Sequence, residues 1–248
     1  KRGVAPQRIG LVDAKPLALS LADPRSIALS YGSRQLLEAI GAWPLAATPI
    51  HEIHVSRRGH FGRSMIDRHD HNVPALIYGA HYADLTGVMT SVWEPLGVGV
   101  TRPARVAGKT EDDNGVVLRL DDGREIAAAL AVQAEGGVFG EQQARARQRD
   151  YGQTAVIARV STGSPIAHRA YERFTDEGPL ALLPQTGADG QQYALVWCVR
   201  PERAQALLAC DDAEFLSQLG GAFGGRLGRF TRATPRVSYP LGLNDDIA

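Results

Sequence analysis

Four strand-like runs follow one another in the second half of the chain, each bounded by turn residues. Two segments with helical spacing of apolar residues come next, and a last strand-like run follows a glycine-rich stretch. Strands this close in sequence predict a mostly antiparallel sheet with helices packed against it. The predicted strands are 153–161, 170–175, 179–184, 193–200 and 236–241, and the predicted helices are 201–209 and 211–223.

The segment Asp23-Pro24-Arg25-Ser26-Ile27-Ala28-Leu29-Ser30 predicts the start of a helix. Asp23 is a natural N-cap, Pro24 suits the first helical position, and Gly41 can end the helix in a left-handed conformation. Free backbone N–H groups and the positive end of the helix dipole would then lie beside Arg25. That arrangement suits a phosphate or pyrophosphate. The alternative is a capped surface helix with a solvated arginine, which this segment by itself favours.

A short strand is predicted over residues 8–12, and Asp13 follows it directly. An acidic residue at the end of a strand holds a ribose hydroxyl in dinucleotide-binding folds. The strand and glycine-rich turn that come before such an acid are not found in this sequence. Asp is also a common turn residue after a strand. Asp13 therefore leaves a nucleotide-binding role and a turn role open.

The middle of the chain predicts a helix over 81–94 followed by a β-meander. Asp-Asn-Gly and Asp-Asp-Gly turns separate the meander strands, which are predicted at 104–109, 116–120 and 126–134. The last of these strands runs into Glu135 and Gly136. Glycine there lets the backbone approach a bound ligand closely, and a plain strand-ending turn is the alternative.

Charge and composition argue against several classes of function. Lys plus Arg and Asp plus Glu number 27 each, and no basic tract indicates a nucleic acid partner. No apolar run is long enough to span a bilayer. Cys198 and Cys210 are too few for a disulfide framework, so we expect a reducing, cytoplasmic environment.

Catalytic residues cannot be assigned from motifs. Histidines gather between His51 and His71, but they lack the spacing of a zinc motif, and we expect no metal. No Ser-His-Asp set or cysteine nucleophile motif stands out. A protein with fragments of a nucleotide site and no acid–base motif can leave its chemistry to a cofactor.

Several segments, taken in order, carry a resemblance to one family. They are Asp23-Pro24-Arg25-Ser26-Ile27-Ala28-Leu29-Ser30-Tyr31-Gly32-Ser33, Tyr171-Glu172-Arg173-Phe174-Thr175, Gly178-Pro179-Leu180-Ala181-Leu182-Leu183-Pro184, Leu195-Val196-Trp197-Cys198 and Ser238-Tyr239-Pro240-Leu241. Together they resemble the ubiquinone-biosynthesis hydroxylases, which are flavoprotein monooxygenases of the p-hydroxybenzoate hydroxylase type. The resemblance covers nearly the whole chain.

The resemblance implies a mixed α/β fold, in which an incomplete Rossmann-like FAD-binding domain is interleaved with a β-sheet substrate domain. We expect residues 1–50 and 77–150 in the FAD-binding domain and 51–76 and 151–243 in the substrate domain. Residues 244–248 would lead into a further FAD-binding segment. The family's glycine-rich turn and its Gly-Asp motif are not found, so we expect an internal fragment that binds FAD poorly and is itself inactive.

The resemblance also implies site residues. Asp13 matches the acid that holds the adenosine ribose, and Arg25 matches the arginine near the FAD pyrophosphate. Glu135 and Gly136 match the family's Asp-Gly motif near the FAD, with Glu in place of Asp. The predicted helix at 81–94 matches the helix that borders the flavin in relatives.

For the whole protein, the resemblance implies an FAD-dependent monooxygenase that uses dioxygen to hydroxylate a polyprenylated phenol in ubiquinone biosynthesis. NAD(P)H or a reductase would supply the electrons. A lipid substrate implies peripheral contact with the inner face of the membrane, and other ubiquinone-biosynthesis proteins are candidate partners. The alternatives are a related flavin hydroxylase acting on another aromatic compound and a noncatalytic substrate-binding or scaffold module.

Overall fold

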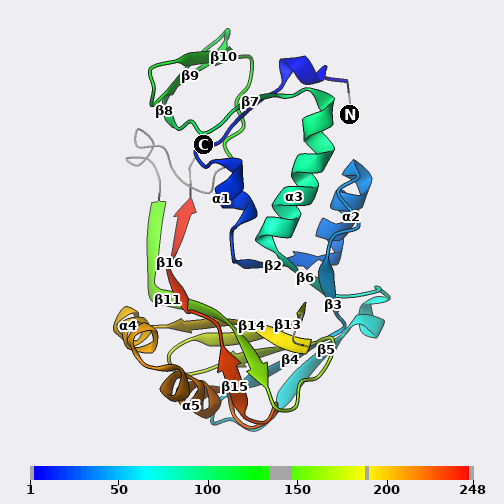
Figure 1. Ribbon diagram of the computed structural model, residues 1–248, viewed down its shortest axis with the longest axis vertical. Coiled ribbons are helices and arrows are strands. Elements are labelled where there is room, and N and C mark those ends of the chain that lie inside the picture. Colours follow the sequence, from blue (N-terminus) through cyan, green and yellow to red (C-terminus); the bar gives the residue numbers. More distant parts are fainter. Residues whose placement is uncertain (1–2, 135–146, 188–189, 246–248) are drawn as a thin grey trace. The chain divides into compact units, whose positions relative to one another are not determined.

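The computed structural model describes residues 3–134, 147–187 and 190–245 (Figure 1). Contacts within the chain divide it into two compact units. Unit 1 comprises residues 1–24, 82–149 and 242–248, and unit 2 comprises residues 25–81 and 150–241. Each unit has its own sheets and helices.

Unit 1 contains a short parallel strand pair, formed by β1 (Gly10–Val12) and β7 (Gly99–Thr101). The short helix α1 (Leu17–Leu21) contacts the longer helix α3 (Tyr82–Trp93). The remaining elements are the 3-10 helices η1 (Pro6–Arg8) and η3 (Glu94–Leu96) and the antiparallel meander β8 (Val106–Asp112), β9 (Gly115–Leu120) and β10 (Glu125–Ala128).

The main sheet of unit 2 has eight strands within the described residues, in the order β15-β11-β14-β13-β12-β4-β5, with β16 beside β11. Strand β12 runs parallel to β4, whereas its pairing with β13 is antiparallel. The strands are β4 (Glu52–Arg57), β5 (Arg63–Asp67), β11 (Arg147–Thr162), β12 (Arg169–Phe174), β13 (Pro179–Gly187), β14 (Gly190–Val199), β15 (Phe230–Ala233) and β16 (Val237–Asp245).

Helices α4 (Pro201–Ala209) and α5 (Asp212–Phe223) pack on one face of this sheet and form the core with it (Figure 1). Trp197 from the sheet and Leu207 and Phe215 from the helices are fully buried there. Burying side chains of this size contributes roughly 1.5–3 kcal/mol each. The mixed α/β architecture and this sheet with its two helices confirm the predicted fold class.

A smaller sheet of unit 2 corrects the helix predicted from Asp23 to Gly41. Residues 26–30 form strand β2 (Ser26–Ser30), which pairs antiparallel with β6 (Ile77–His81). The third strand is β3 (Ala47–Ile50), and the 3-10 helix η2 (Arg68–His71) follows β5. Hydrogen bonding to β6 outweighs the local preference of the segment for a helix start.

Helix α2 (Tyr31–Ile40) therefore begins eight residues after Asp23. Ser30 is its N-cap, because the Ser30 Oγ accepts a hydrogen bond from the backbone N–H of Ser33 at 3.1 Å. Gly41 ends the helix at φ 77°, as predicted. Arg25 lies before β2, so the predicted helix dipole beside Arg25 is wrong.

The predicted limits of another element also differ from the observed ones. The predicted strand 126–134 ends at Ala128, and residues 129–134 have no strand pairing. Residues 25–50 lie in unit 2 by their contacts, and the predicted division of the chain into an FAD-binding and a substrate domain stays a prediction. Pairing of β2 and β3 with β6 holds this segment there. The roles of the two units stay predictions.

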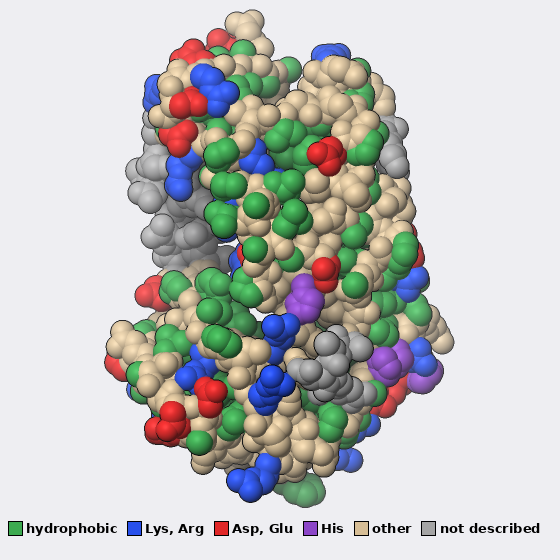
Figure 2. Space-filling view, viewed as in Figure 1, with side chains coloured by type: hydrophobic (Ala, Val, Ile, Leu, Met, Phe, Trp, Pro, Cys, Tyr) green, Lys and Arg blue, Asp and Glu red, His purple; other side chains and the backbone are tan. Residues whose placement is uncertain are grey.

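Acidic and basic side chains are interspersed over the face drawn in Figure 2, with hydrophobic side chains between them. This distribution agrees with the equal numbers of acidic and basic residues in the sequence. None of the helices in the part of the chain that the structure describes has the length and apolar character needed to cross a membrane.

Candidate functional site

Asp13 lies directly after β1, and the parallel pairing of β1 with β7 brings it next to Arg102. Arg102 follows β7, and its guanidinium forms an ion pair with the Asp13 carboxylate. The other carboxylate oxygen accepts a hydrogen bond from the backbone N–H of Lys15 at 2.8 Å. Arg102 Nε donates to the Lys15 carbonyl at 2.7 Å, so one arginine holds both the acid and the turn after it.

The two side chains of this ion pair differ in exposure. The Asp13 side chain is 33% exposed, whereas the Arg102 side chain is 11% exposed. A carboxylate offers about four lone-pair positions, and the described residues supply two donors to Asp13. The remaining positions can accept hydrogen bonds from ribose hydroxyls. The geometry of Asp13 therefore fits the role that the sequence predicts for it.

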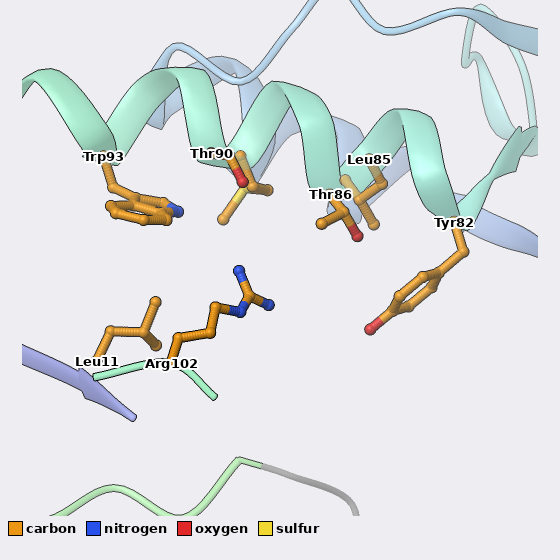
Figure 3. Close-up of a pocket in the computed structure, with 8 residues that line it drawn as sticks. Leu11, Tyr82, Leu85, Thr86, Thr90, Trp93 and Arg102 are labelled. Carbon is orange, nitrogen blue, oxygen red and sulfur yellow. The ribbon is translucent and has the colours of Figure 1, made fainter. Parts of the chain in front are cut away.

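A depression of about 230 Å³ lies beside α3 in unit 1 (Figure 3). Leu11 and Arg102 form one side of it, and the Arg102 guanidinium points toward the helix. A mostly apolar wall with a few polar groups suits a flat ring such as a nucleobase. The side chains from α3 that form the other wall are Tyr82, Leu85, Thr86, Met89, Thr90 and Trp93.

Arg25 in unit 2 lies against an aromatic ring. Its guanidinium carbon is 5.9 Å from the centre of the Tyr239 ring, and Tyr239 is 38% exposed. A cation–π contact uses the face of the guanidinium, whereas the N–H donors lie in its plane. In-plane donors of this kind bind phosphate oxygens in pairs. The contact with Tyr239 positions the Arg25 guanidinium without a helix dipole, and its role toward a phosphate stays a prediction.

The residue after Arg25 ties β2 to the main sheet. Gln185 Nε2 donates a hydrogen bond to Ser26 Oγ at 2.6 Å. Gln185 is buried, and its Oε1 has no hydrogen-bond donor among the residues that the structure describes. A buried amide oxygen without a donor commonly accepts a hydrogen bond from a water or a ligand.

His51, the first histidine of the stretch from His51 to His71, packs against another histidine of unit 2. The His51 and His168 rings stack with their centres 4.4 Å apart, and His168 Nδ1 lies 2.7 Å from the Pro49 carbonyl oxygen. Burial, and then the charge of Arg68, lower the pKa of His51. Within the described ranges, no group of three or more His, Cys, Asp or Glu side chains could hold a metal ion.

Two predicted site residues, Glu135 and Gly136, lie outside the described residues. Their role near a cofactor stays a prediction. Arg102, Tyr239 and Gln185 were missed from the sequence. Arg102 could have been found from its place directly after a strand, because residues that follow neighbouring parallel strands meet at one edge of a sheet.

Comparison of the sequence with known proteins finds no matching family model. Ubiquinone hydroxylase UbiL of Rhodospirillum rubrum is 28% identical over 254 residues, covering 98% of this chain and 57% of UbiL. The uncharacterized protein slr1300 of Synechocystis is 27% identical, covering 95% of this chain and 59% of that protein. The human ubiquinone biosynthesis monooxygenase COQ6 is 31% identical over 112 residues, covering 44% of this chain and 23% of COQ6. The chain thus spans less than three fifths of the length of these relatives.

Solved structures share the fold at lower sequence identity. A variant of PqsL from Pseudomonas aeruginosa has a TM-score of 0.75 at 17% identity, covering 95% of this chain and 67% of PqsL. HpxO from Klebsiella pneumoniae, solved with FAD and uric acid, has a TM-score of 0.65 at 14% identity, covering 94% of this chain and 67% of HpxO. These matches establish the fold.

Proposed function

We propose that this chain belongs to the ubiquinone hydroxylase flavoprotein family and is part of an FAD-dependent monooxygenase that hydroxylates an aromatic ring. The observation that carries the proposal is the relation to UbiL along 98% of the chain. The acid at the end of β1, held by Arg102 beside the depression at α3, supports it independently of sequence identity.

We propose residues 1–50 and 77–150 as part of the FAD-binding domain and residues 51–76 and 151–243 as the substrate domain. Asp13 would hold the adenosine ribose, and Arg25 would bind the pyrophosphate. Glu135 and Gly136 would lie near the cofactor, as the resemblance implies. FAD, once reduced by NAD(P)H or a reductase, supplies the reaction with dioxygen that puts one oxygen atom on the ring. The residues of this chain bind the two molecules, orient them and exclude water.

The proposed substrate is a polyprenylated phenol. The candidate is 2-octaprenyl-6-methoxyphenol, because this chain resembles most the hydroxylase that acts on that compound. Such a lipid would reach the protein from a membrane surface. Exposed apolar side chains on α2 support peripheral contact, because Leu36 is 71% exposed and Ile40 is 40% exposed. Other ubiquinone-biosynthesis proteins are proposed partners.

The test uses the chain extended at both ends to the length of its relatives, supplied with FAD, NADH and ¹⁸O-labelled dioxygen. With 2-octaprenyl-6-methoxyphenol as substrate, we expect one labelled oxygen atom in the hydroxylated product and the other in water. A labelled product from a different aromatic compound would point to a related hydroxylase. Retention of the phenol without flavin or product would favour the noncatalytic binding module and overturn the proposal.

A further inference from the structure

Glu172 lies on the face of the main sheet of unit 2 that α4 and α5 do not cover. Its neighbours on β12 point toward the helices. The Tyr171 ring packs against Phe223 with centres 5.4 Å apart, and Arg173 Nε donates to the Ala222 carbonyl at 3.1 Å. Successive side chains of a strand point to opposite faces, so Glu172 points away from the helices.

The surroundings of Glu172 on this face are apolar. Ala181 of β13 and Val55 of β4 are its registered partners, and Val196 of β14 is the next residue across the sheet. Small and branched apolar side chains on adjacent strands make a surface that can take the face of an aromatic ring. The Glu172 side chain is half-buried among them, so that it can still be reached from outside the sheet.

The Glu172 carboxyl has no hydrogen-bond or ion-pair partner among the residues that the structure describes. Burial raises its pKa. Burial, and then the Glu172 charge, also raise the pKa of the Cys198 thiol on the neighbouring part of the face. A carboxyl placed in an apolar surface without a donor is costly, and such exceptions are commonly explained by a function.

We propose that Glu172 is a substrate-binding residue, which accepts a hydrogen bond from the hydroxyl of a phenol lying on this sheet face. This inference rests on the proposed function and names the group that recognises its substrate. One acid in an apolar surface supplies a single polar contact, which fixes how the ring is turned. A hydrogen bond to a carboxylate is about twice as strong as one between neutral groups, and it makes the ring oxygen more electron-rich.

The binding test uses two probes that differ by one donor, 2-prenylphenol and its methyl ether. We expect the chain to bind the phenol about tenfold more tightly than the ether in calorimetry. Glu172→Leu is expected to lose this preference, and Glu172→Gln to keep part of it. The exposed Glu202 of α4 provides the control. Glu202→Gln replaces a carboxylate by a carboxamide of the same size away from this face, so this variant should bind the phenol as the unchanged chain does.

Unchanged preference for the phenol in Glu172→Leu would overturn the inference. Tighter binding of benzylammonium than of 2-prenylphenol would also overturn it, because the carboxylate would then recognise a cation. The melting temperature serves as the folding control. Neither variant should melt lower than the unchanged chain, since each removes a desolvated carboxyl.

A second measurement separates this inference from the proposed function. In the chain extended to the length of its relatives, Glu172→Leu is expected to raise the KM for the phenol about tenfold. Hydroxylation with an unchanged KM and kcat in Glu172→Leu would overturn the role of Glu172 and leave the proposed function in place. Absence of hydroxylation in the unaltered protein, with phenol binding still dependent on Glu172, would overturn the proposed function alone.

Discussion

The Arg102 guanidinium holds the Asp13 carboxylate where the parallel strands β1 and β7 end side by side. Because Arg102 also donates to the Lys15 carbonyl, it fixes the carboxylate and the backbone turn that follows it. Arg102 lies 87 residues after Lys15 in the sequence, so this contact depends on the pairing of the two strands. The orientation of the proposed ribose-binding acid is thus set by a residue outside its own segment.

Replacing this arginine should destabilise unit 1. Arg102→Ala leaves a partly buried carboxylate and a backbone carbonyl without their donor, which costs about 2 kcal/mol. Urea unfolding measures the loss. Arg124→Ala is the matched control, because Arg124 pairs with Asp122 on the exposed surface of the same unit. Such pairs contribute roughly 0–1 kcal/mol, and an equal cost in the two variants would contradict the structural role of Arg102.

His54 should make folding sensitive to acid. Its side chain is 3% exposed, and neither ring nitrogen has a hydrogen-bond partner among the described residues. Burial, and then the charge of Arg226, lower its pKa below the ordinary value of 6.5. The unfolded chain therefore binds the proton more readily. The contribution of neutral His54 to stability is present above pH 6.5 and is lost as the pH falls through and below that value.

Unfolding free energies at pH 5, 6, 7 and 8 test the role of His54. We expect the unfolding free energy of His54→Phe to fall less between pH 7 and pH 5 than that of the unchanged chain. One proton accounts for a slope of at most about 1.4 kcal/mol per pH unit. The exposed His60 offers the control, and His60→Phe should keep the decline. A decline that persists unchanged in His54→Phe would place the acid sensitivity in another group.

Alanine substitution at two glycines of unit 2 should change the stability of the chain in opposite directions. At Gly178, with φ at 153°, a Cβ would lie 2.5 Å from the Cys198 carbonyl oxygen, so Gly178→Ala should cost roughly 2–4 kcal/mol. Gly221 lies inside α5, and a Cβ there meets no atom within 4 Å. Gly221→Ala should therefore stabilise the chain by roughly 0.5–1 kcal/mol. Thermal unfolding measures both, and a loss of stability in Gly221→Ala would contradict the placement of α5.

Much of the fold could be predicted from local patterns. Strands β13 and β14 of the main sheet contain apolar runs bounded by turn residues, which predict buried strands. Asp211 caps α5 through a hydrogen bond from the Glu214 N–H, and an acidic residue before an apolar helical pattern predicts this start. The segment 26–30 could not be predicted, because its strand depends on pairing with residues 77–81. Local capping signals at Asp23 favoured a helix that this pairing overrides.

Some residues of the candidate site could be predicted from the sequence, and others could not. Asp13 was predicted from its place after a strand. Arg25 was predicted from a helix start that the structure does not have and from the resemblance. Arg102, Tyr239 and Gln185 were missed because each acts through a partner far away in the sequence. Glu172 was missed for a different reason, since its importance lies in what surrounds it on the sheet face. Such surroundings become visible once the strand register is known.

We expect Arg25 to contribute to FAD binding, and a flavin titration measures this contribution. The chain extended to the length of its relatives is titrated with FAD and followed by flavin fluorescence, beside Arg25→Ala and, as control, Arg63→Ala on the exposed strand β5. We predict stoichiometric binding in the unaltered protein and in the control, and about 10- to 100-fold weaker binding in Arg25→Ala. Equal FAD affinity in Arg25→Ala would contradict the role of Arg25, and no FAD binding by the unaltered protein would contradict the proposed cofactor.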